Sequence, residues 1–287
     1  MIIDKHEVTA WKGRILMTKP VKALTIAGSD SSGGAGIQAD LKTFQERGVY
    51  GMTALTTIVA MDPDQDWNHQ VFPVPIPTLK AQLKTILQGI GVDALKTGML
   101  GSVEIIEIAA EVIASQNIPA VVDPVMVCKG TDEVLHPELA DALREILVPK
   151  ATVATPNLFE AGQLSGLGAL NTVEDMKAAA QKIYESGAKY VLVKGGGKLQ
   201  HEKAVDVFYD GETFEVLESE RIETTYTHGA GCTYSAAITA ELAKGKSVRE
   251  AVFTAKAFIT EAIRHGFPLN RFVGPVLHMA HRLHQGK

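Results

Sequence analysis

Cysteine is scarce in this sequence, which contains two among 287 residues. Two cysteines in so long a chain do not build a disulfide framework, and we therefore expect a reducing, cytoplasmic environment. An excess of basic charge is also absent, because 28 Lys and Arg residues stand against 33 Asp and Glu residues. The net charge of −5 argues against a general nucleic-acid-binding protein, although a few local donors can still hold a phosphate group.

Long apolar runs are missing too, and no segment reaches the length needed to span a bilayer. No secretory signal is recognisable. The nine histidines do not show metal-ligand spacing, which disfavours a zinc site. We therefore expect small-molecule ligands, and neither a nucleic acid nor a membrane as partner.

The chain is long enough to bury one large α/β core, and two small domains are the less favoured alternative. Residues 1–16 mix charges with scattered apolar residues and precede a second methionine, Met17. We expect them to be a peripheral extension, unless Met17 is the natural start. Residues 17–287 are assigned to a single domain.

Short β-branched and apolar segments alternate with amphipathic helical patterns along most of the chain, which predicts a mostly parallel sheet covered on both faces. Residues 205–209 and 213–216 read as a hairpin, and residues 62–77 as an irregular loop or an edge strand. Helix starts are expected at Ser102, at a capping box of Asn171 and Glu174, and at another of Ser247 and Glu250. Polar and glycine-rich segments follow the strands, so they should converge at the carboxyl edge of the sheet.

The segment from Thr225 to Ala237 contains the strongest chemical signal. Gly229, Ala230 and Gly231 form a small-residue turn that runs into a helical pattern. Such a turn presents free backbone N–H groups and the positive end of the helix dipole, which together favour a bound phosphate. Cys232 lies at this helix start, where we expect the pKa of its thiol to be lowered. The alternative is that Cys232 is only a small core residue.

A second glycine-rich turn, Gly28 to Gly36, follows the first strand and opens a helix. Its glycines are bunched and do not show the G-x-G-x-x-G spacing of dinucleotide-binding proteins. A nicotinamide-dependent oxidoreductase is therefore a distant alternative.

Five motifs in a fixed order resemble those of the hydroxymethylpyrimidine kinases and their relatives in the ribokinase-like superfamily. The resemblance covers the chain from about Lys22 to the C-terminal region, and it implies a three-layer α/β/α sandwich with a minimal lid. It also implies transfer of a phosphoryl group from MgATP to the hydroxymethyl group of a small substrate. The motifs are AGSD at 27–30 with SGGAGIQADLK at 32–42, DPVM at 123–126, TPNLFEA at 155–161, KGG at 194–196 and GAGC at 229–232.

Three positions favour one branch of this group. Met61 replaces the glutamine that is typical of the hydroxymethylpyrimidine kinases, and Cys128 lies in the expected lid. Together with Cys232 they make the chain similar to the dual-cysteine pyridoxal kinases. Hydroxymethylpyrimidine kinase activity stays open as the near alternative, and a non-catalytic pyridoxal-phosphate carrier as the remote one.

The resemblance assigns roles to particular residues. Cys232 would take the proton from the 5′-hydroxyl, while the amides of Gly229, Ala230 and Gly231 bind the charge on the transferred group. Cys128 would add to the aldehyde of pyridoxal as a hemithioacetal. The vitamin pocket would be lined by Gly28, Asp40, Met61, His69 and Val125.

The nucleotide and metal sites are implied in the same way, with ATP and Mg²⁺ as the cofactors and a homodimer as the assembly. Glu160 would hold Mg²⁺, mainly through water. As plain alternatives, Met61 is strand core, His69 a solvated loop residue and Glu160 a helix-face acid. The expected ATP-binding residues are Asn157, Lys194, Gly195, Gly196, Gly197, Lys198, Asp206, Gly231 and Lys256.

Overall fold

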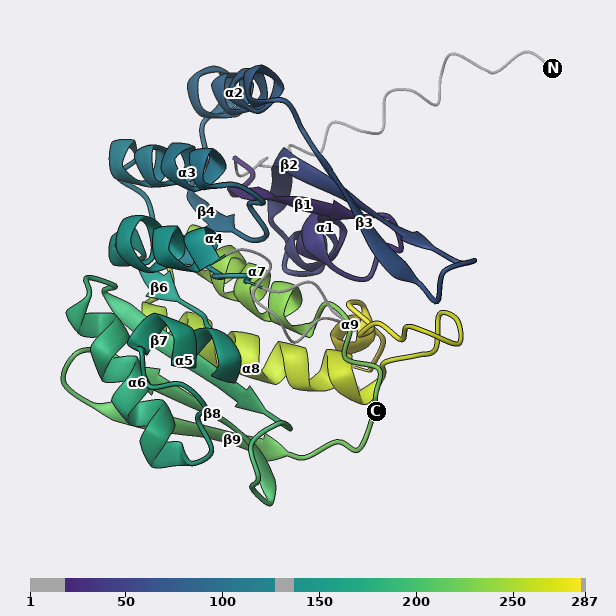
Figure 1. Cartoon of the computed structure of the whole chain (residues 1–287), viewed down its shortest axis with the longest axis vertical. Helices are drawn as coiled ribbons and strands as arrows, with labels where there is room; N and C mark the ends of the chain where they lie inside the picture. Colours follow the sequence, from purple (N-terminus) through teal and green to yellow (C-terminus); the bar gives the residue numbers. More distant parts are fainter. Residues whose placement is uncertain (1–18, 127–136, 285–287) are drawn as a thin grey trace, which may run out of the picture.

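The computed structural model describes residues 19–126 and 137–284. In this part of the chain nine strands form one sheet, in the order β3-β2-β1-β4-β5-β6-β7-β8-β9, with helices on both sides (Figure 1). The strands are β1 (Lys22–Asp30), β2 (Tyr50–Asp62), β3 (Asn68–Pro73), β4 (Ala94–Thr97), β5 (Ala120–Val122), β6 (Val153–Ala154), β7 (Tyr190–Gly196), β8 (Lys203–Tyr209) and β9 (Phe214–Glu220).

The six central strands, from β2 to β7 in the sheet order, pair in parallel, and the prediction of a mostly parallel sheet is confirmed. At one edge β3 pairs antiparallel with β2, so the edge-strand interpretation of residues 62–77 is the correct one. At the other edge β8 and β9 form the predicted hairpin. The carboxyl ends of the parallel strands share one edge of the sheet, and the motifs follow these ends.

Helices cover the two faces as separate layers (Figure 1). On one face lie α2, α3, α4, α5 and α6, and on the other α1, α7 and α8. The bounds are α1 (Gly36–Glu46), α2 (Ile76–Lys84) with the π-helical turn η2 (Thr85–Ile90), α3 (Val103–Ser115), α4 (Pro137–Ala142) with the turns η3 (Leu143–Leu147) and η4 (Val148–Lys150), α5 (Leu158–Ser165), α6 (Val173–Glu185), α7 (Ala230–Ala243), α8 (Val248–Arg264) and α9 (Ala280–His284).

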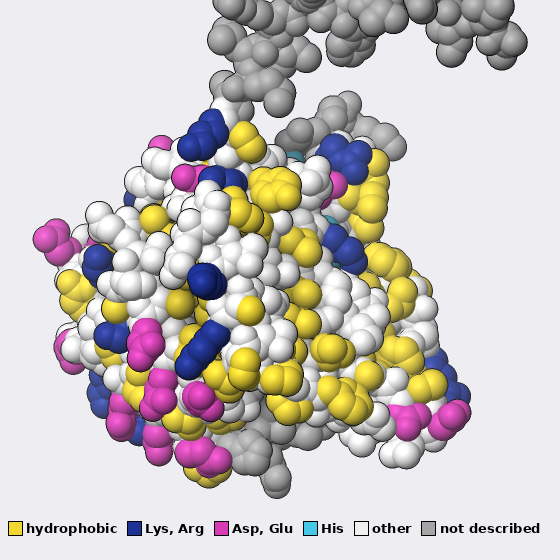
Figure 2. Space-filling model, turned by 90° about the horizontal axis from the view of Figure 1, so that it is seen from above, with side chains coloured by type: hydrophobic (Ala, Val, Ile, Leu, Met, Phe, Trp, Pro, Cys, Tyr) yellow, Lys and Arg dark blue, Asp and Glu magenta, His cyan; other side chains and the backbone are white. Residues whose placement is uncertain are grey.

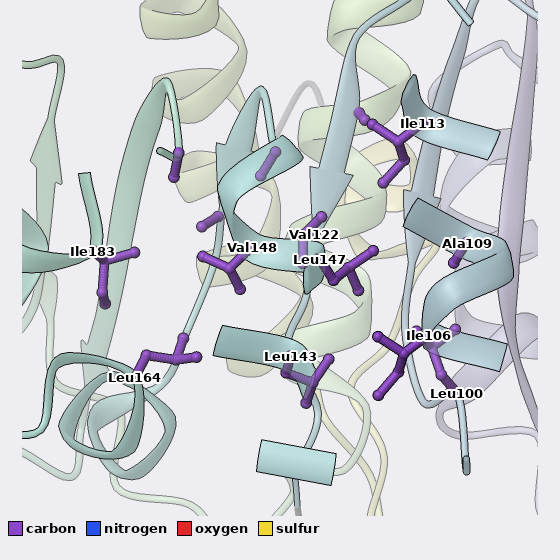
Figure 3. Close-up of a cluster of buried hydrophobic side chains, with 14 of the residues drawn as sticks. Leu100, Ile106, Ala109, Ile113, Val122, Leu143, Leu147, Val148, Leu164 and Ile183 are labelled. Carbon is purple, nitrogen blue, oxygen red and sulfur yellow. The ribbon is translucent and has the colours of Figure 1, made fainter. Parts of the chain in front are cut away.

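The larger core lies between the sheet and the α2–α6 layer (Figure 3). Ile106 of α3 and Leu143 and Leu147 of the α4 segment meet there, close to Val122 of β5, and all four are buried. Each such side chain contributes roughly 1.5–3 kcal/mol through burial. This core fixes the strand ends rigidly, and the loops that follow those ends build the site.

Helix starts follow the predicted capping chemistry with one exception. Ser102 caps α3, and Ser247 with Glu250 forms the expected capping box of α8. The box predicted at Asn171 and Glu174 is wrong by one residue, because Thr172 and Asp175 form it. The Asp175 carboxylate accepts the N–H groups of both residues 171 and 172, at 2.9 Å each, and this double acceptor sets the helix start one residue later.

The predicted extension, residues 1–16, lies outside the described residues, and so does Cys128. None of the described helices has the length and apolar content needed to cross a membrane. The assignment of residues 17–287 to a single domain stays a prediction.

Candidate active site

The glycine-rich turn before α7 holds its shape because of Gly229. This residue is the N-cap at φ +77°, and a Cβ there would overlap the carbonyl oxygen of Gly34. Only glycine fits both constraints. The helix begins at Ala230, so Gly231 and Cys232 lie in its first turn, where N–H groups have no acceptor within the helix. The Ala230 amide instead donates to the carbonyl of Thr227 at 3.1 Å.

Beside this turn is a cavity of about 110 Å³, formed at the carboxyl ends of β1, β2 and β4. Four of the residues expected around the vitamin line it, together with the proposed base Cys232. They are Gly28, Met61, His69 and Val125. The structure thus brings together residues that are up to 204 positions apart (232 − 28) in the chain.

The thiol of Cys232 does not have the lowered pKa that its helix position suggests. Burial raises this pKa to about 11, and it outweighs the opposing influence of the Lys96 ammonium and of a hydrogen bond from the Gly36 amide. The expectation of a lowered pKa was therefore wrong. Cys232 does lie at a helix start, but the free-energy cost of removing its thiolate from water is larger than the stabilisation that one helix terminus provides.

Asp40, which was expected to line the vitamin pocket, lies behind its wall. Its carboxylate accepts from Nζ of Lys96 at 3.0 Å on both oxygens and from the Thr25 hydroxyl at 2.6 Å. The side chains of Asp40 and Lys96 are fully buried. Lys96 is the member of this pair that reaches the cavity wall. Asp40 thus acts on the pocket through Lys96.

Two further polar residues of the cavity wall, Asp30 and His228, were not among the expected site residues. Nε2 of His228 lies 2.6 Å from Oδ2 of Asp30, and both side chains are largely buried. Their positions gave only weak signals, since Asp30 ends the first glycine motif and His228 directly precedes Gly229.

On the other side of the α7 turn lies the segment expected to hold nucleotide. Nζ of Lys194 is 2.7 Å from Oδ1 of Asp123, and a Cβ on Gly231 would stand 3.4 Å from the same Nζ. Asp123 also accepts from the hydroxyls of Thr155 (3.2 Å) and Ser235 (3.3 Å). The first turn of α7 therefore lies between the cavity and a partly buried lysine that is paired with Asp123.

Asn157 and Glu160 cap α5 reciprocally. The Asn157 side chain accepts the Glu160 amide at 3.0 Å, and a Glu160 oxygen accepts the Asn157 amide at 2.8 Å. Burial raises the pKa of the Glu160 carboxyl to about 7, although Lys194 opposes this. Glu160 is thus a buried acid that is oriented by the helix and electrostatically linked to Asp123.

The remaining expected nucleotide residues gather at the end of β7 and on the neighbouring elements. Asp206 of β8 accepts from the Gly196 amide at 3.1 Å and from Nζ of Lys256 in α8 at 2.7 Å. Gly195 has no room for a side chain, because a Cβ would press on the backbone of Val205 and on Met176. Gly197 and Lys198 are exposed beyond the strand end.

A family model described as phosphomethylpyrimidine kinase matches residues 30–277. The chain belongs to the phosphomethylpyrimidine kinase family. A pyridoxine kinase of Bacillus subtilis is 69% identical to it over 265 residues, which cover 92% of this chain and 98% of the relative. The fold is ribokinase-like, as the resemblance implied.

Solved structures of family members superpose closely. The structure of an ADP complex of Bacillus subtilis pyridoxal kinase has a TM-score of 0.90, at 69% identity, and covers 92% of this chain and 99% of that one. A Staphylococcus aureus pyridoxal kinase in complex with AMP-PCP and pyridoxal has a TM-score of 0.87, at 55% identity, with coverages of 92% and 96%.

The other branch of the family is less similar. A hydroxymethylpyrimidine/phosphomethylpyrimidine kinase of Bacillus subtilis is 41% identical over 260 residues, covering 90% of this chain and 95% of the relative. The pyridoxine kinase of the same organism is thus closer by 28 percentage points (69 − 41).

Proposed function

We propose that this family member is a pyridoxal kinase, which transfers the γ-phosphoryl group of ATP to the 5′-hydroxymethyl group of pyridoxal and so makes pyridoxal 5′-phosphate. Pyridoxine and pyridoxamine are further candidate substrates. The observation that carries the proposal is the position of the α7 turn, with the cavity and Cys232 on one side and Lys194 on the other. The high identity to a pyridoxine kinase supports the choice of vitamin.

In this proposal the Cys232 thiolate accepts the hydroxyl proton as the substrate oxygen bonds to the γ-phosphorus and the bond to the ADP oxygen breaks. The amides of Gly231 and Cys232 in the first turn of α7 donate to the transferred group, and the Lys194 ammonium lies beside Gly231 to balance its charge. The thiolate is a minor species in the ligand-free protein at neutral pH, because burial raises the pKa of Cys232. The Lys96 ammonium and the Gly36 amide favour that thiolate.

Mg²⁺ is implied by the family resemblance, and the residues present are compatible with it. Glu160 and Asp123 supply hard carboxylate oxygens close to Lys194 and Gly231. Within the described residues no group of three or more metal-ligating side chains forms a cage, which suits an ion held mainly by phosphate oxygens and water. Bound there, the ion would neutralise charge on the β- and γ-phosphates.

The proposed role of Cys128, reversible addition to the aldehyde, rests on the family resemblance. It applies to pyridoxal and cannot apply to pyridoxine, which has no aldehyde. A comparison of pyridoxal with pyridoxine therefore distinguishes covalent addition by Cys128 from an effect of Cys128 on substrate binding in general.

A steady-state comparison of pyridoxal, pyridoxine, pyridoxamine and hydroxymethylpyrimidine with MgATP tests the proposal. We expect the highest kcat/KM with a B6 vitamer. A large preference for the pyrimidine would replace our proposal by the thiamine-pathway alternative. Absence of ATP consumption with every B6 form would favour a non-catalytic pyridoxal-phosphate carrier.

We also propose a homodimer in the cytoplasm. The free edge of β3 and its surroundings expose large apolar side chains, including Ile58, Val71 and Phe72. Figure 2 shows hydrophobic side chains spread over the middle and right of the face that contains this edge. Sedimentation velocity of the full chain tests the dimer, and a monomer at micromolar concentration would contradict it. The cytoplasmic assignment rests on cysteine usage.

A further inference from the structure

The two glycine-rich turns of the site pack directly against each other. Gly229 leaves no room for a Cβ beside the carbonyl of Gly34, and Gly34 leaves none beside the ring of His228. The turn between β1 and α1 and the turn before α7 are 195 residues apart (229 − 34) and meet backbone to backbone. Contact this close leaves the position of α7 sensitive to anything that separates the turns.

A buried hydrogen bond joins these turns. Nε2 of His228 is 2.6 Å from Oδ2 of Asp30, and the side chains are 9% and 8% exposed. A carboxylate can only accept, so the Nε2 of His228 is the donor. Burial opposes ionisation of Asp30, but the hydrogen bonds from His228 and Ser32 lower its pKa to about 2. Asp30 is therefore a carboxylate throughout the neutral range.

Each partner is anchored in its own segment. Asp30 accepts the amides of Ser32 and Ala35, both at 2.8 Å, and so shapes the turn that leads into α1. The backbone of His228 donates to Gly274 at 3.1 Å and accepts from Val276 at 3.2 Å. The pair thus links the β1–α1 turn, the α7 turn and the C-terminal segment.

The segments that hold Asp30 and His228 both lie close to Cys232 in the chain or in the cavity wall. His228 is four residues before Cys232 and directly precedes the Gly229 cap. Ala35, held by Asp30, directly precedes Gly36, which lines the same cavity as Cys232. The bond between Asp30 and His228 thus connects the helix that carries the thiol to the start of α1 on the same cavity.

We propose that Asp30 and His228 form a positioning clasp for phosphoryl transfer, which holds the first turn of α7 and the Gly36 amide in register around Cys232. The inference rests on the proposed function. Displacement of a catalytic group by about 1 Å costs on the order of 100-fold in rate. Loss of the clasp therefore lowers kcat more than it raises the KM for ATP.

The decisive experiment compares two substitutions of the same histidine. His228→Gln retains an N–H donor at the position of Nε2, whereas His228→Asn places its donor nearer the backbone, at the position of Nδ1. We expect His228→Asn to lower kcat by roughly 10- to 100-fold, with the KM for ATP changed less than about threefold. His228→Gln should recover most of this loss.

A matched control comes from a second buried histidine bonded to α7. Nε2 of His278 is 3.0 Å from the hydroxyl of Thr233, and His278 does not line the cavity. His278→Asn should lower the melting temperature but leave kcat within about twofold. If it lowers kcat as much as His228→Asn does, or if the Gln and Asn variants at position 228 behave alike, the clasp is refuted.

A second readout needs no turnover. The pH dependence of Cys232 alkylation by iodoacetamide, followed by mass spectrometry of its peptide, reports the thiolate directly. We expect the profile of His228→Asn to move to higher pH and that of His278→Asn to stay at the wild-type position. An unshifted profile for both overturns the clasp. A wild-type protein that phosphorylates no B6 vitamer refutes the proposed function alone, and the alkylation result still decides on the clasp.

Discussion

Lys96 carries a positive charge into the wall of the cavity, and its replacement by methionine should expose what that charge does. Its Nζ contacts both oxygens of Asp40 at 3.0 Å, and both side chains are fully buried. The methionine side chain in Lys96→Met fills about the same space as lysine, but the carboxylate of Asp40 loses its positively charged partner. Breaking a buried pair from one side typically costs about 3–5 kcal/mol.

The size of the loss follows from the proton that Asp40 must then bind. Burial raises the pKa of this carboxyl even with Lys96 in place, and loss of the ammonium, which lowers this pKa, raises it further. The unfolded chain has a pKa of 3.8 at this position, and each unit between that value and the working pH costs about 1.4 kcal/mol. The penalty therefore grows as the pH rises above this value, by at most about 1.4 kcal/mol per unit, and is larger at pH 7 than at pH 5.

The sign of the pH dependence is a test in itself. A folded-state pKa raised above the unfolded value stabilises at low pH, and that stability is lost as the pH rises. Urea unfolding of Lys96→Met at pH 7 and pH 5, each against wild type, should show the defect shrinking in acid. A defect that is equal at both pH values would refute the reasoning.

The double variant Lys96→Met/Asp40→Asn provides the control. Asparagine keeps an acceptor for the Thr25 hydroxyl, which now donates to Asp40 at 2.6 Å, and it brings no charge into the core. We expect the double variant to be more stable than Lys96→Met alone, because the stranded carboxylate is gone. Its Cys232 alkylation should still require a higher pH than in wild type, because the ammonium is missing. If the stability losses of the two single substitutions simply add in the double variant, the interaction between Lys96 and Asp40 is contradicted.

Three further predictions concern the turn and the two cysteines. Cys232→Ala should abolish turnover but keep nucleotide binding, as measured by calorimetry. In the wild type, kcat should rise by up to about tenfold per pH unit between roughly pH 7 and 9, because the pKa of this thiol is about 11. Cys128→Ala should lower kcat/KM for pyridoxal much more than for pyridoxine, and equal losses would exclude the hemithioacetal. Gly229→Ala should lower the free energy of unfolding by more than about 3 kcal/mol, because a Cβ there meets the Gly34 carbonyl. The control Gly245→Ala is also at positive φ but in open space, and it should cost roughly 1–2 kcal/mol in thermal unfolding.

The parts of the fold that the sequence predicts are those determined by local pattern. Buried parallel strands need continuous apolar runs, so β1, β2, β4 and β5 could be located from composition alone. Helix starts depend on a few side chains, so Ser102 and Ser247 were recognisable as caps. The failure at Asn171 shows the limit of this reasoning, since neighbouring residues offer competing caps and only the geometry of Asp175 decides.

The site is less predictable because its contacts join distant positions. Lys96 is the single charged residue of β4, whose four residues prove to be all buried in the structure. Nothing local indicates that its partner is Asp40, 56 residues away. The hydrogen bond between Asp30 and His228 joins residues 198 positions apart, and nothing local indicates this pairing either. Single residues of these pairs can be suspected from motifs, but the pairs cannot.

The pKa of Cys232 shows how burial and helix position compete. A helix start favours a thiolate, and Cys232 lies in the first turn of α7 and lines the same cavity as Gly36, which opens α1. Burial nevertheless wins and keeps the thiol protonated in the ligand-free protein. In the proposed mechanism a neutral resting thiol is an advantage, because a permanently charged thiolate would repel the γ-phosphate. The Lys96 ammonium opposes this effect of burial, so it lowers the cost of forming the thiolate that the proposed mechanism requires.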